Sequence, residues 1–362
     1  MQRSVTEYGE GYEFLQDYIY RLGADELTAF GEKQMIDAGA SFYRRYRPIS
    51  NHTAPFVRAS GQNRVIQSAV KWAEGYDGSK RMDLHLAASS TGGVTIIPEG
   101  EGFNNTLDHG LCLAFEETDL GGEAQMDWAQ IFVPQIRDRL NANLKGANLD
   151  IDQTIQLMDI CPMDTISYLD AHLSQFCHLF TVDEWKSYDY YQSLGKYYGH
   201  GDGNPLGPTQ GVGWVNELIA RLTKAPVVDH TTTNATLDQS DKTFPLDRAI
   251  YADFSHDNTM ASVYAAMGLY ANTKKLSKKA RQSPVETGGF SASWTVPFGG
   301  RMFVEKMVCS GDDAELVRVL VNDRVIPLST CKADDLGRCN LDAFVESLAF
   351  ARKGGEWDKC FT

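Results

Sequence analysis

The sequence has no apolar run that approaches the roughly 20 residues of a membrane-spanning helix. Its first ten residues, MQRSVTEYGE, contain no apolar core of the kind that defines a secretory signal peptide. Internal repeats and low-complexity tracts are absent as well. Taken alone, these absences argue against a membrane-spanning protein and a repeat protein, and they favour a cytoplasmic location.

Several motifs of hydrolytic enzymes are also missing. The sequence has no G-x-S-x-G, which argues against a serine hydrolase built on a nucleophile elbow. It has no H-E-x-x-H and no other tight His/Asp cluster, so we expect neither a catalytic metal nor another cofactor. A C-x-x-C pattern of a zinc or redox site is absent too.

The sequence has fewer basic than acidic residues. The chain has 34 Lys and Arg against 48 Asp and Glu, which gives a net charge of −14 and a pI of about 5.0. This balance argues against nucleic acid as a partner, because nucleic-acid-binding surfaces are basic. An anionic small substrate stays compatible with it, since a local basic pocket can lie within an acidic surface. The acidic surface also suits work at low pH, where carboxylates begin to lose their charge.

Seven cysteines and three glycosylation sequons favour a secreted protein. Cys161 and Cys177, like Cys331 and Cys339, are spaced to close short loops. A lone sequon is usually chance, but three sequons together with loop-spaced cysteines favour secretion. Because seven is odd, one thiol is either free or missing its partner. The sequons begin at Asn51, Asn104 and Asn234.

A chain of 362 residues with 43% hydrophobic and 11% aromatic residues can form about two domains with substantial cores. Strand-like and helix-like segments alternate in its flanking regions, whereas residues from about 80 to 200 are typical of helices joined by irregular loops. This pattern predicts an α/β sheet that carries a smaller helical domain. The expected strands are 55–60, 249–254, 301–308 and 316–322, and the expected helices are 25–47, 64–74, 131–144, 181–198, 210–222 and 259–270.

The pair His256-Asp257 lies where an expected strand ends and a helix begins. Free backbone N–H groups and the helix dipole make such a place an anion site. An imidazole and a carboxyl group side by side there could bind a phosphate and protonate its leaving oxygen. The alternative is an ordinary N-cap, in which Ser255 or Asp257 satisfies the first N–H groups of the helix.

Arg58 repeats this design at the end of another expected strand, just before a helix. In open α/β sheets, ligand sites gather beyond the carboxyl ends of the strands. An arginine there can bind phosphate oxygens bidentately, a geometry that lysine cannot copy. The alternative is a surface arginine in an ordinary ion pair.

Three further residues have both a functional and a plain interpretation. Lys196 could supply positive charge to an anionic substrate, or it could be a solvated lysine. Asp159 could face a substrate or cap a helix. His200 lies in a glycine-rich loop whose sequence lacks the pattern of other potential metal ligands, so we expect a structural role for it.

Four longer strings carry a family resemblance. They are FVRASGQNRVI at 56–66, YDYYQSLGKYYGHG at 188–201, NPLGPTQG at 204–211 and DFSHDN at 253–258. Together they resemble fungal phytases, which are secreted members of the histidine acid phosphatase family in branch 2 of the histidine phosphatase superfamily. The likeness runs from about Tyr12 to Cys360, nearly the whole chain.

The resemblance implies metal-free hydrolysis of phosphomonoesters. In this family a histidine of an Arg-His-Gly-x-Arg-x-Pro motif attacks phosphorus and forms a phosphohistidine. Arg58 and His256 match phosphate-binding residues, and Asp257 matches the acid that protonates the leaving alkoxide. Asp159 and Lys196 match positions that line the substrate pocket, but Gly195 stands where some relatives have a second lysine.

The sequence departs from the family at the nucleophile, because it contains no Arg-His dipeptide and none of its eight histidines offers a substitute in the right context. The resemblance also implies disulfides between Cys112 and Cys360, between Cys161 and Cys177, and between Cys331 and Cys339. Cys309 is left unpaired, since its family partner precedes the nucleophile motif. One absent N-terminal segment would account for the motif, the signal peptide and the odd cysteine, and we expect a central strand of the sheet to be absent with it.

The sequence and the resemblance thus predict an α/β protein with a doubly wound, mostly parallel sheet flanked by helices and an inserted smaller all-α domain. Residues 1–85 and 200–362 are expected to form the α/β domain, incomplete at its N-terminus, and residues 86–199 the helical domain over the substrate. The expected function is that of a secreted, monomeric phytase of the 3-phytase type that acts on myo-inositol hexakisphosphate (phytate), without nucleic-acid or membrane partners. The 362-residue chain itself is expected to be nearly inactive. The alternatives are a non-catalytic inositol-phosphate-binding pseudoenzyme and a broad-specificity acid phosphatase.

Overall fold

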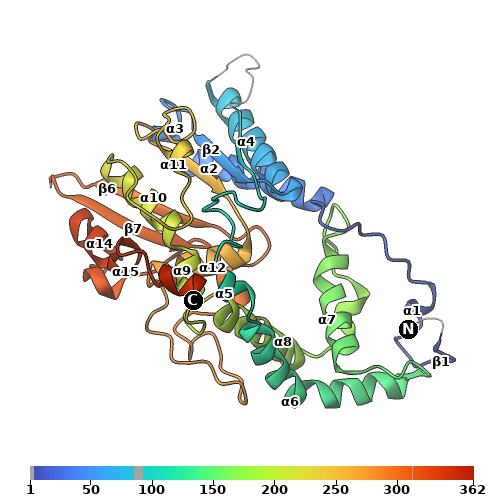
Figure 1. Cartoon of the computed structure of the whole chain (residues 1–362). Helices are drawn as coiled ribbons and strands as arrows, with labels where there is room; N and C mark the ends of the chain where they lie inside the picture. Colours follow the sequence, from blue (N-terminus) through green and yellow to red (C-terminus); the bar gives the residue numbers. More distant parts are fainter. Residues whose placement is uncertain (1–3, 85–92, 312) are drawn as a thin grey trace.

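The computed structural model describes residues 4–84, 93–311 and 313–362. A three-stranded parallel sheet, a four-stranded antiparallel sheet and a group of long helices make up most of the molecule (Figure 1). The mixed α/β class with a parallel sheet agrees with the prediction from the sequence. The predicted domain boundary at 85/86 lies outside the described residues. Within the described ranges, no helix is long and apolar enough to cross a membrane.

The parallel sheet has strand β2 (Phe56–Ser60) at its centre, between β3 (Thr95–Ile97) and β5 (Tyr251–Phe254). The predicted strands at 55–60 and 249–254 are confirmed, whereas the sequence did not predict β3. Arg58 pairs in register with Thr95 and with Asp253. Because the carboxyl ends of parallel strands meet at one edge, the residues that follow these three strands come together there.

Helices α2 (Ala29–Arg45) and α4 (Asn63–Leu84) pack against each other and against β2. Both helices carry a glycine where they cross. A Cβ atom on Gly75 would lie 1.9 Å from the carbonyl oxygen of Ile36, and one on Gly39 would lie 1.9 Å from that of Trp72. Gly75 is therefore a contact point inside α4, and the prediction that this helix ends before it is wrong.

Strands β6 (Met302–Val308) and β7 (Glu315–Val321) confirm the two predicted C-terminal strands. They pair antiparallel, with β8 (Arg324–Val325) and β9 (Arg338–Asn340) beside β7, in a sheet separate from the parallel one. Apolar side chains of β7 share the largest core with those of α10 (Val212–Thr223), α12 (Asp257–Ala266) and α14 (Leu341–Ser347).

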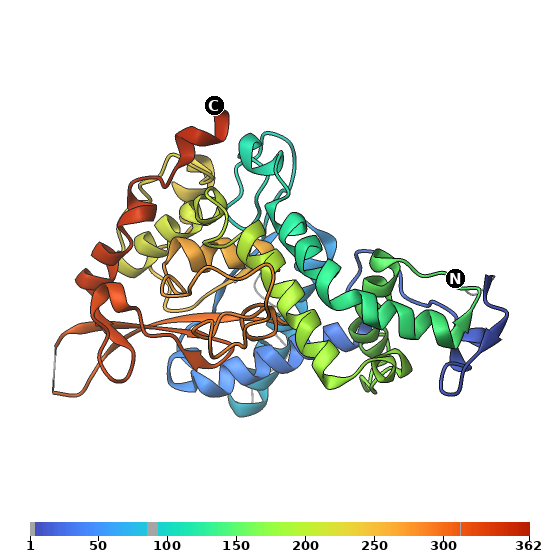
Figure 2. The same cartoon turned by 90° about the horizontal axis from the view of Figure 1, so that it is seen from below.

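Helices α6 (Leu120–Asn143), α7 (Ile151–Thr165) and α8 (Val182–Gly199) form the helical part (Figure 1). Thr181 and Glu184 form a capping box that starts α8, close to the predicted start at 181. Strand β1 (Glu7–Tyr8) pairs with β4 (Leu144–Lys145), and the buried side chains of Tyr12 and Leu15 join the core of α6 and α7. Figure 2 shows this N-terminal segment beside the helical part, although the predicted domains assign residues 1–85 to the α/β part.

Three disulfides join Cys112 to Cys360, Cys161 to Cys177 and Cys331 to Cys339, and Cys309 carries a free thiol. The first of them ties the C-terminal 3₁₀ turn to the short helix α5 (Leu113–Glu116). The other short helical elements are α1 (Phe14–Asp17), α3 (Arg47–Ser50), α9 (Gly207–Gln210), α11 (Ala235–Asp238), α13 (Ala292–Thr295), α15 (Ala349–Arg352), η2 (Gln175–Leu179), η3 (Ser329–Cys331) and η4 (Trp357–Phe361).

Candidate active site

His256 and Asp257 lie at the junction of β5 and α12, as the sequence predicts. His256 is the N-cap residue of α12, and its side chain makes no capping hydrogen bond. The hydroxyl of Ser255 donates to the carbonyl oxygen of Leu107 at 2.6 Å, so Ser255 is not the cap. Because the imidazole of His256 does not cap the helix, it is available to bind a ligand at the edge of the sheet. The free N–H groups of α12 favour an anion there.

Lys196, in the last turn of α8, reaches this junction. Its ammonium group binds the carboxylate of Asp257 and donates to Oδ1 of Asn258 at 2.5 Å. The lysine side chain is only 17% exposed, so the interpretation as a solvated lysine is wrong. Burial alone would raise the pKa of Asp257, but the Lys196 ammonium outweighs this effect and holds that pKa below its usual range.

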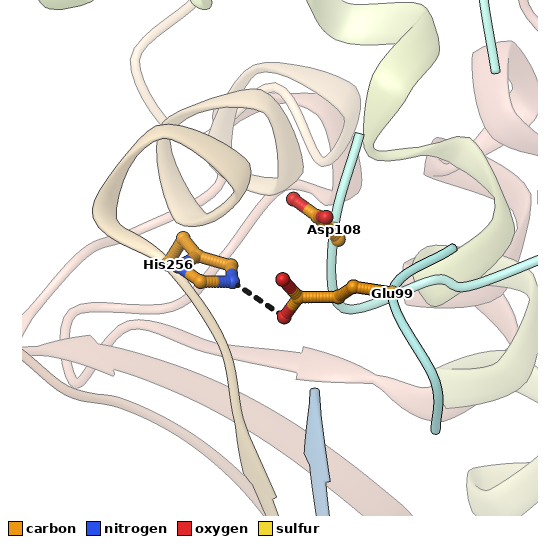
Figure 3. Close-up of side chains that lie close together, drawn as sticks. All are labelled: Glu99, Asp108 and His256. Atoms are coloured by element: carbon orange, nitrogen blue, oxygen red, sulfur yellow. Dashed lines mark hydrogen bonds and ion pairs between the residues drawn. The ribbon is translucent and has the colours of Figure 1, made fainter. Parts of the chain in front are cut away.

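Glu99, which follows β3, holds His256 from the other side (Figure 3). Its Oε1 lies 3.0 Å from Nε2 of His256 and accepts hydrogen bonds from the Ser60 hydroxyl at 2.5 Å and from the Gln62 backbone N–H at 3.1 Å. Burial acts to raise the pKa of Glu99, but the hydrogen bonds from Ser60 and His256 outweigh it and lower that pKa. Residues that follow β2, β3 and β5 therefore meet at the predicted sheet edge.

Asp108 completes a group of possible cation ligands with Glu99 and His256 (Figure 3). Their candidate ligand atoms all lie within 4.8 Å of one another. A cavity of about 480 Å³ opens beside Glu99 and Asp108, with Asn105 and His109 also in its wall. Its volume suits a small-molecule ligand.

Arg58 lies deeper in the same sheet, two residues before Ser60. Its Nε and Nη2 bind the carboxylate of Asp253 at 2.9 Å each, and Nη2 also binds Oε2 of Glu217 at 2.6 Å. The arginine is 2% exposed, so the interpretation as a surface arginine is wrong, although the ion pair is real. Burial opposes the charge of Arg58, but Asp253 and Glu217 outweigh burial and raise its pKa.

Asp159 and His200 are linked to the site through α8. Asp159, on α7, accepts a hydrogen bond from the Tyr188 hydroxyl, which also accepts one from Gln192 at 2.8 Å. Tyr188, Gln192 and Lys196 recur every fourth residue and so share one face of α8, with Tyr188 about 12 Å along the helix from Lys196. Burial raises the pKa of Asp159 despite the Tyr188 hydrogen bond.

His200 follows α8 as its C-cap residue, and its ring lies against the rings of His109 and Phe115. Burial, aided by the nearby charges of His109 and Lys196, lowers the pKa of His200 to about 4. A neutral, packed imidazole suits the structural role that we expect for it.

Sequence reasoning missed three carboxylates of this site: Glu99, Glu217 and Asp253. Glu99 follows a strand, so recognition of β3 would have placed it at the sheet edge by the same rule as His256. Glu217 lies within α10 and contacts Arg58 only through the tertiary fold, 159 residues away in the sequence. No local pattern in the sequence links Glu217 to Arg58.

Known proteins resemble this chain along its whole length. A family model described as histidine phosphatase superfamily (branch 2) matches residues 2–322. Phytase A of Aspergillus oryzae is 52% identical over 365 residues, which cover 100% of this chain and 78% of that protein.

Solved structures show the same fold. The crystal structure of the phytase from D. castellii superposes with a TM-score of 0.76 at 22% identity, over 99% of this chain and 74% of that one. The Bifidobacterium longum multiple inositol polyphosphate phosphatase, in complex with inositol hexasulfate, gives a TM-score of 0.60 at 13% identity, over 90% and 80% of the two chains. Because its family model covers most of the sequence and its relatives match throughout, the chain belongs to branch 2 of the histidine phosphatase superfamily.

Proposed function

We propose that this site binds phosphomonoesters of myo-inositol hexakisphosphate and protonates the leaving alkoxide in a phytase reaction. The observation that carries the proposal is the junction of β5 and α12, where Lys196 contacts Asp257 beside His256. A cation, an imidazole, an acid and the N-terminus of a helix converge there, which is the equipment that a phosphate ester requires. Relatives named Phytase A support the choice of substrate.

In this proposal Asp257 gains its proton when the substrate arrives. Without substrate, Lys196 holds the pKa of Asp257 low, which suits an ionised carboxylate rather than an acid. An incoming phosphate attracts the Lys196 ammonium and brings negative charge close to Asp257. Both changes raise the pKa of Asp257, so the carboxyl group is protonated in the complex and can donate to the alkoxide.

The remaining roles follow the resemblance. His256 donates a hydrogen bond to the phosphate, Arg58 is a phosphate ligand, and Asp159 and Lys196 line the wall that faces the inositol ring. The chain contains no Arg-His dipeptide to supply the family's nucleophile, and we propose that the 362-residue chain by itself turns over nearly no substrate. The 3-phytase type, the monomeric state and secretion also belong to this proposal.

Glycosylation of the three sequons belongs to the proposal as well, but their side chains differ in the structure. The amide nitrogen of Asn104, the atom that would carry a glycan, donates to the carbonyl oxygens of Thr231 at 3.3 Å and Thr233 at 2.8 Å. Among the residues that the structure describes, Asn51 and Asn234 accept hydrogen bonds at the amide oxygen, and their amide nitrogens make none. Glycans at Asn51 and Asn234 therefore fit the fold better than one at Asn104.

Ligand binding and turnover, measured on the same purified chain, test the proposal. We expect calorimetry to detect binding of inositol hexasulfate, and H256A to weaken it by at least about tenfold, because a hydrogen bond to a charged group contributes about 1.5–3 kcal/mol. H172A is the matched control, since His172 is exposed and contacts its own loop through Asp170 and Tyr168. Phosphate release from phytate should be close to zero. No binding would overturn the site assignment, and turnover at the rate of a fungal phytase would overturn the inactivity.

A second candidate, a non-catalytic inositol-phosphate-binding protein, is favoured by the same absence of an Arg-His dipeptide. Binding without turnover fits both candidates, so a further observation must separate them. The transcript upstream of the Met1 codon provides it. An in-frame Arg-His-Gly-x-Arg-x-Pro there supports the phytase, and an in-frame stop codon supports the binding protein.

A further inference from the structure

A buried carboxyl group, that of Glu217, and a half-buried one, that of Asp238, face each other behind Arg58. Glu217, on α10, is 2% exposed, and its Oε2 accepts from Nη2 of Arg58 at 2.6 Å and from the Thr106 hydroxyl at 2.9 Å. Asp238, the last residue of α11, lies within hydrogen-bonding reach of Glu217. Oδ2 of Asp238 is buried and has no partner in the described part of the chain. Carboxylates accept hydrogen bonds and cannot donate them, so two facing carboxyl groups form one only if they hold a proton.

The charged groups around this pair are closely balanced. Asp238 faces Glu217 and Arg221 from α10 and Arg58 from β2. Both arginines bind Asp253 of β5, and both guanidinium groups lie over the ring of Phe244, at 5.3 Å for Arg58 and 4.8 Å for Arg221. With one proton on the carboxyl pair, the two arginines and the three acids sum to zero net charge. Without it, the cluster carries one uncompensated negative charge in a buried place.

We propose that Asp238 and Glu217 share one proton in the native protein and that this proton positions Arg58 to bind the phosphate of the substrate. The inference rests on the proposed function, in which Arg58 is a phosphate ligand. Glu217 binds one guanidinium nitrogen, Nη2, and with the proton present the positive charge of Arg58 is not overcompensated. Loss of the proton adds a third negative charge to the two that already surround Arg58, which binds the guanidinium more tightly to the acids and weakens its attraction for an anion. Asp238 and Glu217 are thus positioning residues that act through Arg58.

The electrostatics of the cluster agree with a shared proton. Burial, followed by the charge of Glu217, raises the pKa of Asp238 to about 7, although Arg58 and Arg221 act to lower it. In the unfolded chain this aspartate has its ordinary pKa of 3.8. The native state therefore holds a proton that the unfolded state loses, so this group's contribution to stability is present below about pH 4 and is lost as the pH rises to about 7.

The test compares D238N with the native chain and with D241N. Asparagine has the shape of a protonated aspartate and cannot ionise, so D238N should fold and keep the protonated form of the cluster at every pH. Asp241 is exposed and three residues further along, which makes D241N the matched control. Urea unfolding between pH 5 and pH 8 should show that the folding equilibrium constant of the native chain falls at least about tenfold further than that of D238N. D241N should follow the native chain. Parallel curves for D238N and the native chain would overturn the shared proton.

Anion binding tests the second half of the inference. Inositol hexasulfate is the probe, because its sulfate groups keep their charge over this pH range. Between pH 5 and pH 8, its affinity for the native chain and for D241N should fall at least about threefold more than its affinity for D238N. Equal losses in all three proteins would overturn the positioning of Arg58 while leaving the proposed function intact. If no form bound inositol hexasulfate at either pH, the proposed function and the positioning of Arg58 would both be overturned. The urea unfolding curves would still test whether Asp238 and Glu217 share a proton.

A second variant covers the case that D238N does not fold. E217Q keeps an oxygen acceptor for Arg58 and Thr106 but removes the facing negative charge. Asp238 should then lose its proton at a lower pH, and the fall in stability should move to lower pH by at least one unit. An unchanged position of this fall would overturn the pairing of the two carboxyl groups.

Discussion

Asp257 carries a conflict between its position and its surroundings. The proposed role of Asp257 as proton donor requires it to hold a proton, yet the Lys196 ammonium favours the ionised carboxylate and outweighs the effect of burial. The side chain of Asp257 is 56% exposed, so solvent screens this interaction and limits its energy. The conflict is resolved if Lys196 moves to the substrate, because the same charge that binds the phosphate then stops opposing the protonation of Asp257.

Replacement of Lys196 by methionine tests this coupling in the free protein. A carboxylate with a lowered pKa stabilises the native state above its unfolded pKa of 3.8, and this stabilisation is lost as the pH falls through the folded pKa. K196M should therefore be less stable than the native chain at pH 7, by at most about 1 kcal/mol. The difference should shrink as the pH falls to about 3. Urea unfolding at both pH values measures it.

K186M is the control for this prediction. Lys186 lies on the same helix, α8, and is exposed. Lys186 has only a minor influence on the pKa of Asp183, which is set mainly by Arg281, so a methionine there should leave the pH dependence of stability nearly unchanged. An equal pH-dependent loss in both variants would show that the lysines act through the overall charge of the protein rather than through Asp257.

At the scale of the element, the crossing of α2 and α4 depends on glycine. A Cβ atom on Gly75 would meet the backbone of α2 at Ile36, and a backbone cannot swing aside as a flexible side chain can. We expect G75A to lower the free energy of unfolding by about 1–3 kcal/mol, even though alanine is the better helix former. Thermal or urea unfolding measures the loss.

Gly78, one turn further along the same helix, supplies the matched control. A Cβ atom there would meet no heavy atom within 4 Å from outside its own helix backbone, within the described part of the chain. G78A should therefore stabilise the protein, by about 0.5–1 kcal/mol, because it removes only the entropic cost of glycine. If G75A were as harmless as G78A, the close approach of the two helices would not be a determinant of stability.

The same crossing explains which elements could be predicted from the sequence. Strand β2 and helix α8 follow local patterns, a buried apolar run before a glycine and a capping box, and both are where the sequence places them. The end of α4 was misplaced because a glycine stops a helix in isolation, whereas this one lets two helices touch. Strand β3 was missed because three residues are too few for a periodic pattern.

The residues of the site also differ in whether a local sequence pattern or only the tertiary fold reveals them. His256, Asp257 and Lys196 lie in strings that resemble one family, and the fold brings Lys196 into contact with Asp257. The partners that set their charge state come from distant parts of the chain: Glu99 lies 157 residues from His256, and Glu217 lies 159 from Arg58. The register of β2 beside β3 places Glu99, and the packing of α10 against the sheet places Glu217, and no local pattern encodes either of them.

At the scale of the whole molecule, the disulfide Cys112–Cys360 joins positions that are 248 residues apart. Both cysteines are fully buried, and they pack with Phe115. The bond fixes the C-terminal turn against α5, near the cavity beside Glu99, whose wall includes Phe361. It also restricts the unfolded chain, and the closed loop is long, so its contribution to stability should be large.

Removal of this disulfide by the double substitution C112A/C360A should lower the free energy of unfolding by about 2–5 kcal/mol. Alanine avoids placing a hydroxyl group in the buried cluster. C309S is the control, because the free Cys309 thiol is only partly buried and contacts Arg338 through an interaction that a serine can retain. It should change stability by less than about 0.5 kcal/mol. If C309S lost as much stability as the double variant, the loss in the double variant could not be attributed to the Cys112–Cys360 cross-link.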